Sequence, residues 1–156
     1  MAKNSRILLA DDDAILQRSV ARIAAGYGYE VISAQMGAEV VAMAAQLLPE
    51  LIVLDIRFPD ADGRDLLQQL KENPTTAGIP VLVWSGSEYE SDRRIALALG
   101  AEDFVEKSEP ATLLPKIARV LLRLKQEHQA TDLSWSPTRS DFNTAPAPIT
   151  ARPLGR

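Results

Sequence analysis

Acidic residues follow two short apolar segments of the chain. The segment 51-LIVLDIRFPDADG-63 places Asp55 after four apolar residues, and 7-ILLADDD-13 ends in an acidic run that contains Asp11 and Asp12. If these segments are neighbouring strands, the three carboxylates converge and raise one another's pKa values. A hard divalent cation relieves that repulsion, and Mg²⁺ fits best because it takes a few carboxylates and shares its shell with a phosphate oxygen. Such a site supports phosphoryl transfer to an aspartate nucleophile.

Two more polar residues follow apolar segments later in the chain. Ser85 comes directly after 81-VLVW-84, and Lys107 comes shortly after Phe104 and Val105. A lysine ammonium can lie against a phosphoryl oxygen, and a hydroxyl can donate a hydrogen bond to another. Each residue alone is weak evidence, because a lysine or a serine at a strand end is usually solvated. Their joint placement with the carboxylates indicates a phosphoryl site.

Alternating short apolar runs and amphipathic stretches must position these residues. The predicted strands contain residues 7–10, 31–32, 51–54, 81–84 and 104–105. The predicted helices contain residues 15–27, 40–48, 66–70, 95–99 and 113–124. Strict alternation predicts an α/β domain with a doubly wound, five-stranded parallel sheet joined by right-handed crossovers. Open sheets of this kind bind ligands at the carboxyl ends of their strands, where the polar residues above are expected.

Composition favours one globular domain. The chain has 156 residues, of which 46% are hydrophobic, and a net charge of −4 that provides no basic surplus for binding nucleic acid. It has no cysteine, and its only histidine, His128, is expected to be solvated near a helix end. No window approaches the ~18 apolar residues of a membrane span. We expect a soluble, cytoplasmic protein without direct nucleic acid binding or membrane insertion.

The last part of the chain differs in composition. From Gln129 onward it holds four prolines, many Ser, Thr and Ala residues, and no helical or strand period. Such a segment cannot bury enough apolar surface to offset its ordering entropy, so we predict a folded domain over 5–127 and a disordered tail or linker over 129–156. Three spaced apolar residues in the tail fit either a docking motif or ordinary linker composition: Trp135, Phe142 and Ile149.

The motifs together resemble the receiver domain of two-component response regulators. The resemblance covers about residues 5–127 and rests on ILLADDD, LIVLDIRFPDADG, VLVWSG and GAEDFVEKS, in that order. It implies a flavodoxin-like (βα)5 fold with strand order 2-1-3-4-5. It also implies a signalling phosphoacceptor rather than an enzyme, and a stand-alone receiver, because no output pattern follows Leu124.

Site roles follow from the resemblance position by position. They are the phosphoacceptor (Asp55), the acidic pair that holds Mg²⁺ with it (Asp11 and Asp12), the backbone carbonyl that completes the metal shell (Arg57), the switch hydroxyl (Ser85), the switch aromatic (Phe104) and the strand-end lysine (Lys107). The implied phosphoryl donor is a histidine kinase or a histidine phosphotransfer protein. The implied output is a downstream protein partner or a homodimer through the face of the fourth helix, fifth strand and fifth helix.

The sequence departs from the family pattern at three places. Ser108 stands where a proline usually follows the lysine, so we expect a trans bond and a less tightly held Lys107. Arg57 is bulky and could shield the acyl phosphate from water or contact it, which leaves the phosphoryl lifetime open. Pro115 predicts a late start of the last helix, with Thr112 as N-cap.

Alternative functions have less support. A receiver that docks partners without being phosphorylated remains open. A haloacid-dehalogenase-type phosphatase would need a second aspartate where Arg57 stands, and no substrate-capping domain is evident. A calcium loop around 58-FPDADG-63 fails because its first and twelfth positions are Phe58 and Gln69. Asp60 and Asp62 are instead expected to shape the turn and cap the helix that begins near Arg64.

Overall fold

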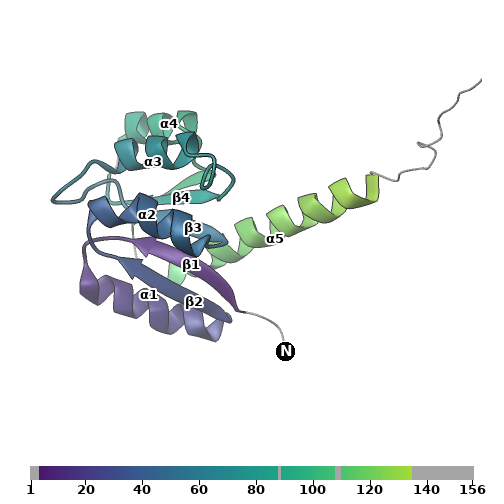
Figure 1. Cartoon of the computed structure of the whole chain (residues 1–156). Helices are drawn as coiled ribbons and strands as arrows, with labels where there is room; N and C mark the ends of the chain where they lie inside the picture. Colours follow the sequence, from purple (N-terminus) through teal and green to yellow (C-terminus); the bar gives the residue numbers. More distant parts are fainter. Residues whose placement is uncertain (1–3, 88, 108–109, 135–156) are drawn as a thin grey trace, which may run out of the picture. The chain divides into compact units, whose positions relative to one another are not determined.

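Strands and helices alternate along the computed structural model, which describes residues 4–87, 89–107 and 110–134 (Figure 1). The strands are β1 (Ser5–Ala10), β2 (Tyr29–Ala34), β3 (Leu51–Leu54), β4 (Val81–Ser85) and β5 (Asp103–Glu106). The helices are α1 (Ala14–Gly26), α2 (Gly37–Leu47), α3 (Gly63–Glu72), α4 (Glu90–Ala98) and α5 (Pro110–Ser134). Residues 1–121 form one compact unit, which contains every site discussed below.

The five strands form one parallel sheet in the order β2-β1-β3-β4-β5, as predicted. The register places Ala10 of β1 opposite Leu54 of β3. Asp11 and Asp55 therefore leave adjacent strands at the same level. Likewise Ser85 of β4 lies opposite Glu106 of β5, which places Lys107 at the same edge of the sheet.

Buried side chains cover both faces of the sheet. Leu8, Ile52 and Val83 belong to one buried cluster together with residues of α2, α3 and α4. Because side chains alternate along a strand, Leu9 and Leu82 point to the opposite face, where α1 and the first turns of α5 supply the buried partners. Figure 1 shows α2, α3 and α4 on one side of the sheet and α1 on the other. Burial on both faces explains why the strands read as unbroken apolar runs.

Most helix ends follow from local sequence. Asp13 is the N-cap of α1, and its carboxylate accepts hydrogen bonds from the amides of Ile15 and Leu16 at 3.0 Å. Asp62 caps α3 through the amide of Arg64 at 2.9 Å, as expected. These helices begin where a short polar side chain satisfies free amide groups.

Asp60 has a different role from the one predicted. Its two carboxylate oxygens accept hydrogen bonds, each of 2.9 Å, from the amides of Gly37 and Ala38 at the start of α2. Asp60 therefore caps α2 rather than α3, and it ties the loop after Asp55 to another helix. These hydrogen bonds lower the pKa of Asp60. The approach is close, because a Cβ atom on Gly37 would lie 2.5 Å from the Cβ atom of Ala61.

Replacing Asp60 by alanine is expected to lower the midpoint of thermal unfolding by a few degrees. The Asp60 pKa is lowered in the folded state, so its contribution is present at neutral pH and disappears as the pH falls through that lowered value. Thermal scans of wild type and variant should therefore converge in acid. Glu50→Ala, which removes an exposed carboxylate, is the control. A difference between wild type and Asp60→Ala that persists at low pH would contradict the capping role.

The start of α5 differs from the prediction. The expected N-cap at Thr112 is wrong, since the helix already begins at Pro110. A proline suits the first helical position, where the missing N–H has no intrahelical partner. Pro115 lies inside the helix rather than in its first turn.

The helix α5 continues to Ser134, beyond Leu124, where its apolar period ends, and the division into a folded domain over 5–127 and a tail over 129–156 stays a prediction. Adding a residue to an existing helix gains a hydrogen bond at small cost, so the helix outlasts its apolar period. Within the described part of the chain, neither α5 nor another helix has the length and apolar character that a membrane crossing requires. The remaining tail lies outside the described residues, and with it Trp135, Phe142 and Ile149.

Candidate phosphoryl-transfer site

Three carboxylates meet at the carboxyl ends of β1 and β3. Asp11, Asp12 and Asp55 each offer an oxygen, and these oxygens lie within 4.8 Å of one another. Asp11 and Asp55 are buried, whereas Asp12 is exposed. The predicted convergence is confirmed. Its cause is the pairing of β1 with β3, which brings together residues 44 positions apart in the sequence.

The backbone around Asp11 is held by a residue that the sequence interpretation missed. Asp11 Oδ1 accepts a hydrogen bond from the amide of Asp13 at 2.9 Å. The buried Gln17 donates from Nε2 to the carbonyl oxygens of Leu9, Asp11 and Ala34, at 3.4, 2.5 and 3.1 Å. Gln17 thus joins the ends of β1 and β2 beneath the acidic pair. A polar residue within the buried stripe of α1 was the available signal.

Asp55 lies in an environment that disfavours its charge. Its side chain follows the end of β3, and the residue is 7% exposed. Burial raises the pKa of the Asp55 carboxyl, the charge of Lys107 opposes this shift, and the negative Asp11 adds to it. The amide of Arg57 donates a weak hydrogen bond of 3.4 Å to Asp55 Oδ1. The ionised carboxylate is therefore poorly solvated, which favours reaction with an electrophile or binding of a cation.

Lys107 bridges two of the three carboxylates. Its Nζ atom lies 2.5 Å from Asp11 Oδ2 and 3.1 Å from Asp55 Oδ2. Burial alone would lower the pKa of Lys107, but the hydrogen bond to Asp11 and the charges of Asp55 and Asp11 outweigh it and raise that pKa. The lysine is therefore a permanent cation at this edge of the sheet. The next residue, Ser108, lies outside the described residues, so the trans bond expected there stays a prediction.

The oxygen atoms present suit a hard divalent cation. Asp12 presents a carboxylate to solvent beside the buried Asp11 and Asp55. Arg57 forms an isolated antiparallel bridge with Asp62, but its two hydrogen bonds are made by the carbonyl of Ile56 and the amide of Phe58. The bridge leaves the Arg57 carbonyl oxygen available to a ligand. Carboxylates, a carbonyl and water are the donors that Mg²⁺ prefers.

Ser85 connects the site to α4 through short hydrogen bonds. It is buried at the end of β4, and its Oγ atom accepts a hydrogen bond from the amide of Ser87 at 3.2 Å. The Ser87 hydroxyl in turn donates to Asp92 in the first turn of α4. Ser87 and Asp92 were not identified from the sequence. A change in the position of Ser85 would thus reach α4 directly.

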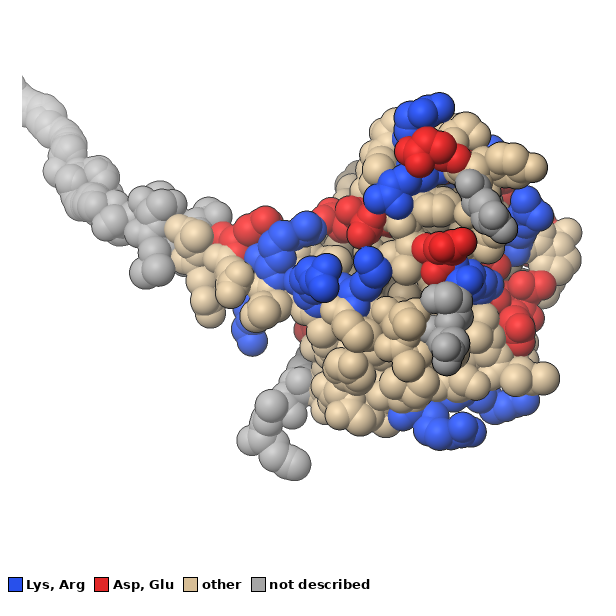
Figure 2. Space-filling view, turned by 180° about the vertical axis from the view of Figure 1, so that it is seen from behind, with Lys and Arg blue, Asp and Glu red and all other residues tan. Residues whose placement is uncertain are grey.

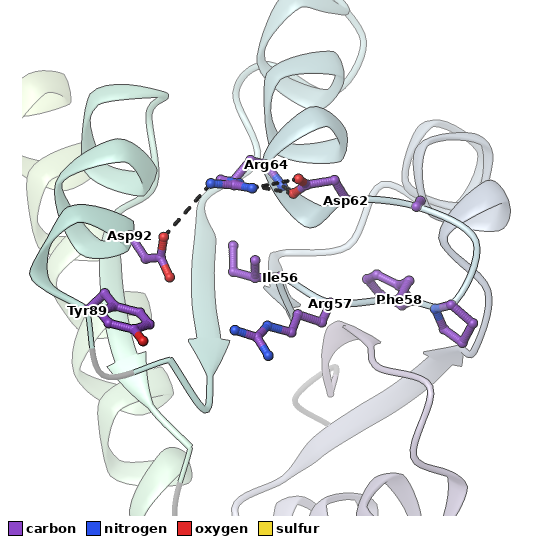
Figure 3. Close-up of a pocket in the computed structure, with 9 residues that line it drawn as sticks. Ile56, Arg57, Phe58, Asp62, Arg64, Tyr89 and Asp92 are labelled. Atoms are coloured by element: carbon purple, nitrogen blue, oxygen red, sulfur yellow. Dashed lines mark hydrogen bonds and ion pairs between the residues drawn. The ribbon is translucent and has the colours of Figure 1, made fainter.

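Phe104 and Arg57 have opposite exposures. Phe104 is buried in the cluster of the α2, α3 and α4 face, whereas the Arg57 side chain is exposed. Arg57 lines a cavity of about 650 Å³ beside the site, between the loop after β3 and the start of α4. Figure 3 shows Arg64 between Asp62 and Asp92, while Arg57 extends toward the side that carries Tyr89. A donor group approaching Asp55 from this side would meet Arg57.

Known sequences agree with this geometry. Residues 7–119 match the family described as the response regulator receiver domain. Response regulator PleD of Caulobacter vibrioides is 38% identical over 123 residues, which are 78% of this chain and 27% of PleD. Response regulator MprA of Mycolicibacterium vanbaalenii is 33% identical over 141 residues, which are 90% of this chain and 60% of MprA. The chain thus spans about a quarter and about three fifths of these relatives.

Solved structures agree as well. A CheY-like response regulator receiver domain protein from Methanospirillum hungatei has a TM-score of 0.73 and 29% identity, covering 80% of this chain and 98% of that one. Chemotaxis response regulator CheY4 of Vibrio cholerae has a TM-score of 0.69 and 24% identity, covering 75% and 98%, and supports the fold alone. With the family match over residues 7–119, these likenesses show that the chain belongs to the response regulator receiver domains.

Proposed function

We propose that Asp55 accepts a phosphoryl group from the phosphohistidine of a histidine kinase or a histidine phosphotransfer protein. Receiver domains are signalling phosphoacceptors of two-component systems rather than classical enzymes. The observation that carries the assignment to Asp55 is its set of neighbours: an oxygen of Asp55 lies within 4.8 Å of oxygens of Asp11 and Asp12, and the Lys107 ammonium lies 3.1 Å from Asp55 Oδ2.

The chemical step uses the ionised form of Asp55. A carboxylate oxygen attacks phosphorus, forming an O–P bond as the P–N bond to the donor imidazole breaks. If the donor ring carries a proton on its other nitrogen, it leaves as neutral histidine, and the charges balance. The Lys107 ammonium is placed to contact an oxygen of the phosphoryl group throughout the transfer, because it already lies 3.1 Å from Asp55 Oδ2. The product is an acyl phosphate on Asp55.

Mg²⁺ is the cofactor that these residues fit. Asp11, Asp12, Asp55 and the carbonyl of Arg57 would hold it, and the bound cation supplies charge neutralisation on the transferring group. On the protein's side, Gln17 fixes the backbone of Asp11, and the Arg57 amide orients Asp55. These contacts keep the oxygen donors in place before the donor protein arrives.

Ser85 and Phe104 are proposed as the switch. If the Ser85 side chain rotates to bring its hydroxyl to a phosphoryl oxygen, its Oγ atom moves relative to the Ser87 amide that donates to it, and Ser87 in turn donates to Asp92 of α4. Phosphorylation thus biases the loop between β4 and α4. Phe104 follows Asp103, and Arg93 of α4 donates to the Phe104 carbonyl at 3.0 Å. A shift of α4 would therefore also reach β5.

The direct test is incubation of the protein with acetyl phosphate and Mg²⁺, followed by intact-mass measurement. One phosphoryl group per chain is expected to be incorporated. No incorporation is expected when a chelator removes Mg²⁺. Equal incorporation with the chelator would contradict the metal requirement. Beryllofluoride with Mg²⁺ should then shift the amide NMR signals of Ser85, Ser87 and Phe104. Unchanged signals in a protein that is phosphorylated would indicate a phosphoryl relay without a switch.

Docking of the phosphodonor protein is proposed beside the acidic pair. Ile15, in the first turn of α1, is 70% exposed and follows closely after Asp12. A protein that brings a phosphohistidine to Asp55 must cover this edge, and an apolar side chain there favours its binding. Ile15→Glu is expected to slow phosphotransfer from a phosphorylated histidine phosphotransfer protein by about tenfold, while phosphorylation by acetyl phosphate stays unchanged.

The matched control for Ile15 is Leu48, which is 58% exposed after the last turn of α2, at the opposite end of the fold. Leu48 has a left-handed backbone (φ 49°), which asparagine tolerates, so Leu48→Asn removes an exposed apolar group without strain. Phosphotransfer should be unaffected in this variant. Equal slowing in both variants, or slowing with acetyl phosphate as well, would exclude a docking role for Ile15.

The finer expectations about output remain proposals. They are a downstream protein partner, cytoplasmic location, and self-association through the α4-β5-α5 face. On α4, Ile95 and Leu97 are each 40% exposed, which suits an interface. On the face shown in Figure 2, Lys and Arg side chains drawn in colour lie beside Asp and Glu side chains rather than forming one continuous basic surface. This supports a protein partner rather than nucleic acid.

The second candidate function is a receiver that docks partners without phosphorylation. It would keep the fold and the partner surface but gain no phosphoryl group in the mass experiment. The geometry around Asp55 argues against it, because a docking surface needs no buried carboxylate between a lysine and two aspartates. The hypothesis of a haloacid-dehalogenase-type phosphatase loses further support, because the receiver family matches residues 7–119.

A further inference from the structure

Trp84 lies directly beneath the strand-end lysine. It precedes Ser85 on β4, it is 1% exposed, and its ring centroid lies 5.3 Å from Lys107 Nζ. A cation within about 6 Å of an indole face is attracted by the negative face of the ring. The Lys107 ammonium therefore contacts the ring of Trp84 and the carboxylates of Asp11 and Asp55.

The buried indole of Trp84 carries an energetic cost, because its N–H group lacks a hydrogen-bond partner among the described residues. Among the described residues, Trp84 Nε1 is a buried side-chain nitrogen without a hydrogen-bond partner, and Lys107 lies over the same ring. An unpaired N–H removed from water destabilises the fold, a cost that a buried leucine or phenylalanine would not carry. Another interaction of the Trp84 ring should therefore offset the cost of its unpaired N–H group. The only charged group over its ring among the described residues is Lys107.

Lys107 needs such support because of its own flexibility. A lysine side chain has four rotatable bonds and a compact charge that many positions near two carboxylates would satisfy. The residue after it is Ser108, so no proline ring fixes the backbone there. An aromatic face below the ammonium limits its positions to those between the ring and the carboxylates.

We propose that Trp84 is a positioning residue, which holds the Lys107 ammonium between Asp11 and Asp55 and so places it for the phosphoryl oxygen. The inference rests on the proposed phosphoryl acceptance by Asp55. It assigns to Trp84 a part in the reaction rate that the buried side chain of a core residue would not have.

The test compares three variants by phosphorylation rate with acetyl phosphate at saturating Mg²⁺. Trp84→Leu removes the ring and is expected to slow phosphorylation about 3- to 30-fold, the range that a cation–π contact of this kind supports. Trp84→Phe keeps a weaker ring and should lose less. Leu82→Ala removes buried volume on the same face of β4, farther from the lysine, and should lower the unfolding midpoint while leaving the rate close to wild type.

A double-mutant cycle separates positioning from packing. In a Lys107→Ala background, Trp84→Leu is expected to cause no further slowing, since there is no ammonium left to hold. If Trp84→Leu slows the reaction equally with and without Lys107, or leaves the rate of the wild-type background unchanged, Trp84 is a core residue only and the proposal is wrong.

A second measurement is independent of phosphorylation. The ring face should move the NMR signals of the Lys107 ε-methylene protons upfield in the wild type, and this displacement should shrink in Trp84→Phe and vanish in Trp84→Leu. If the wild type takes no phosphoryl group, the proposed function fails, yet these signals still decide whether the ring holds the lysine. Lys107 signals without an upfield displacement in the wild type would overturn the positioning role. Because Trp84→Phe removes less buried volume than Trp84→Leu, it provides the answer if Trp84→Leu does not fold.

Discussion

Asp55→Asn will gain no phosphoryl group from acetyl phosphate and Mg²⁺, whereas the wild type will gain one. An amide oxygen is neutral and a poor nucleophile, so the loss is expected to be complete rather than partial. The substitution leaves the shape of the residue nearly unchanged, and the amide of Asp55 still donates to the carbonyl of Ala10 at 2.9 Å. Intact-mass measurement over a time course is the readout.

Asp65→Asn is the matched control for Asp55. Asp65 is an exposed carboxylate in the first turn of α3, outside the acidic cluster. Its variant should incorporate the phosphoryl group at the wild-type rate. Incorporation into Asp55→Asn at that rate would place the acceptor elsewhere and remove the proposed function.

Stability provides a further check on the same variant. Burial raises the pKa of Asp55 in the folded state, so the folded protein binds a proton more tightly than the unfolded chain does. The contribution of Asp55 to the free energy of unfolding is therefore greatest below the ordinary aspartate pKa and is lost as the pH rises through the raised value. At neutral pH without Mg²⁺, Asp55→Asn should therefore unfold at a higher denaturant concentration than the wild type. The gain should vanish in acid.

A methyl group on Gly63 will disrupt the backbone that carries Asp55. A Cβ atom on Gly63 would lie 2.5 Å from the Cα atom of Ile56, and it would also clash with the backbone carbonyl oxygen of Asp55. Both are backbone atoms, so no side chain can move aside. The amide of Gly63 also donates to the carbonyl of Ile56 at 2.6 Å, which holds the loop closed over β3.

Gly63→Ala is accordingly expected to lose about 3 kcal/mol of stability. Phosphorylation should slow as well, since the backbone of Asp55 must shift to make room. Gly78→Ala is the control, because a Cβ atom there would meet no heavy atom within 4 Å. Chemical denaturation and acetyl phosphate kinetics measure the two effects. Two variants of equal stability would show that the loop after Asp55 adapts freely, contrary to the close contacts around Gly63.

Local sequence determined the elements and the ends of several of them. Short apolar runs predicted the five strands, and β3 and β4 are buried along their whole length, because a strand covered on both faces needs apolar side chains at consecutive positions, whereas β2 is only partly buried. Asp62 was predicted as a cap because a carboxylate reaches amides two or three residues further along, and Asp13 caps α1 for the same reason. Residues at the carboxyl ends of parallel strands share one edge of the sheet, so Asp11 and Asp55 were predicted to meet if their strands are neighbours.

Tertiary structure decided the contacts between segments distant in the sequence. Asp60 caps α2 across 23 residues instead of the adjacent helix, since α2 and the loop after β3 pack closely enough to require Gly37. Gln17 contacts three carbonyl groups from two strands. Trp84 lies under Lys107 because β4 and β5 are paired in register. No local period encodes such contacts. The sequence by itself thus determined which groups could react, and the packing of neighbouring elements decided which residues hold them in place.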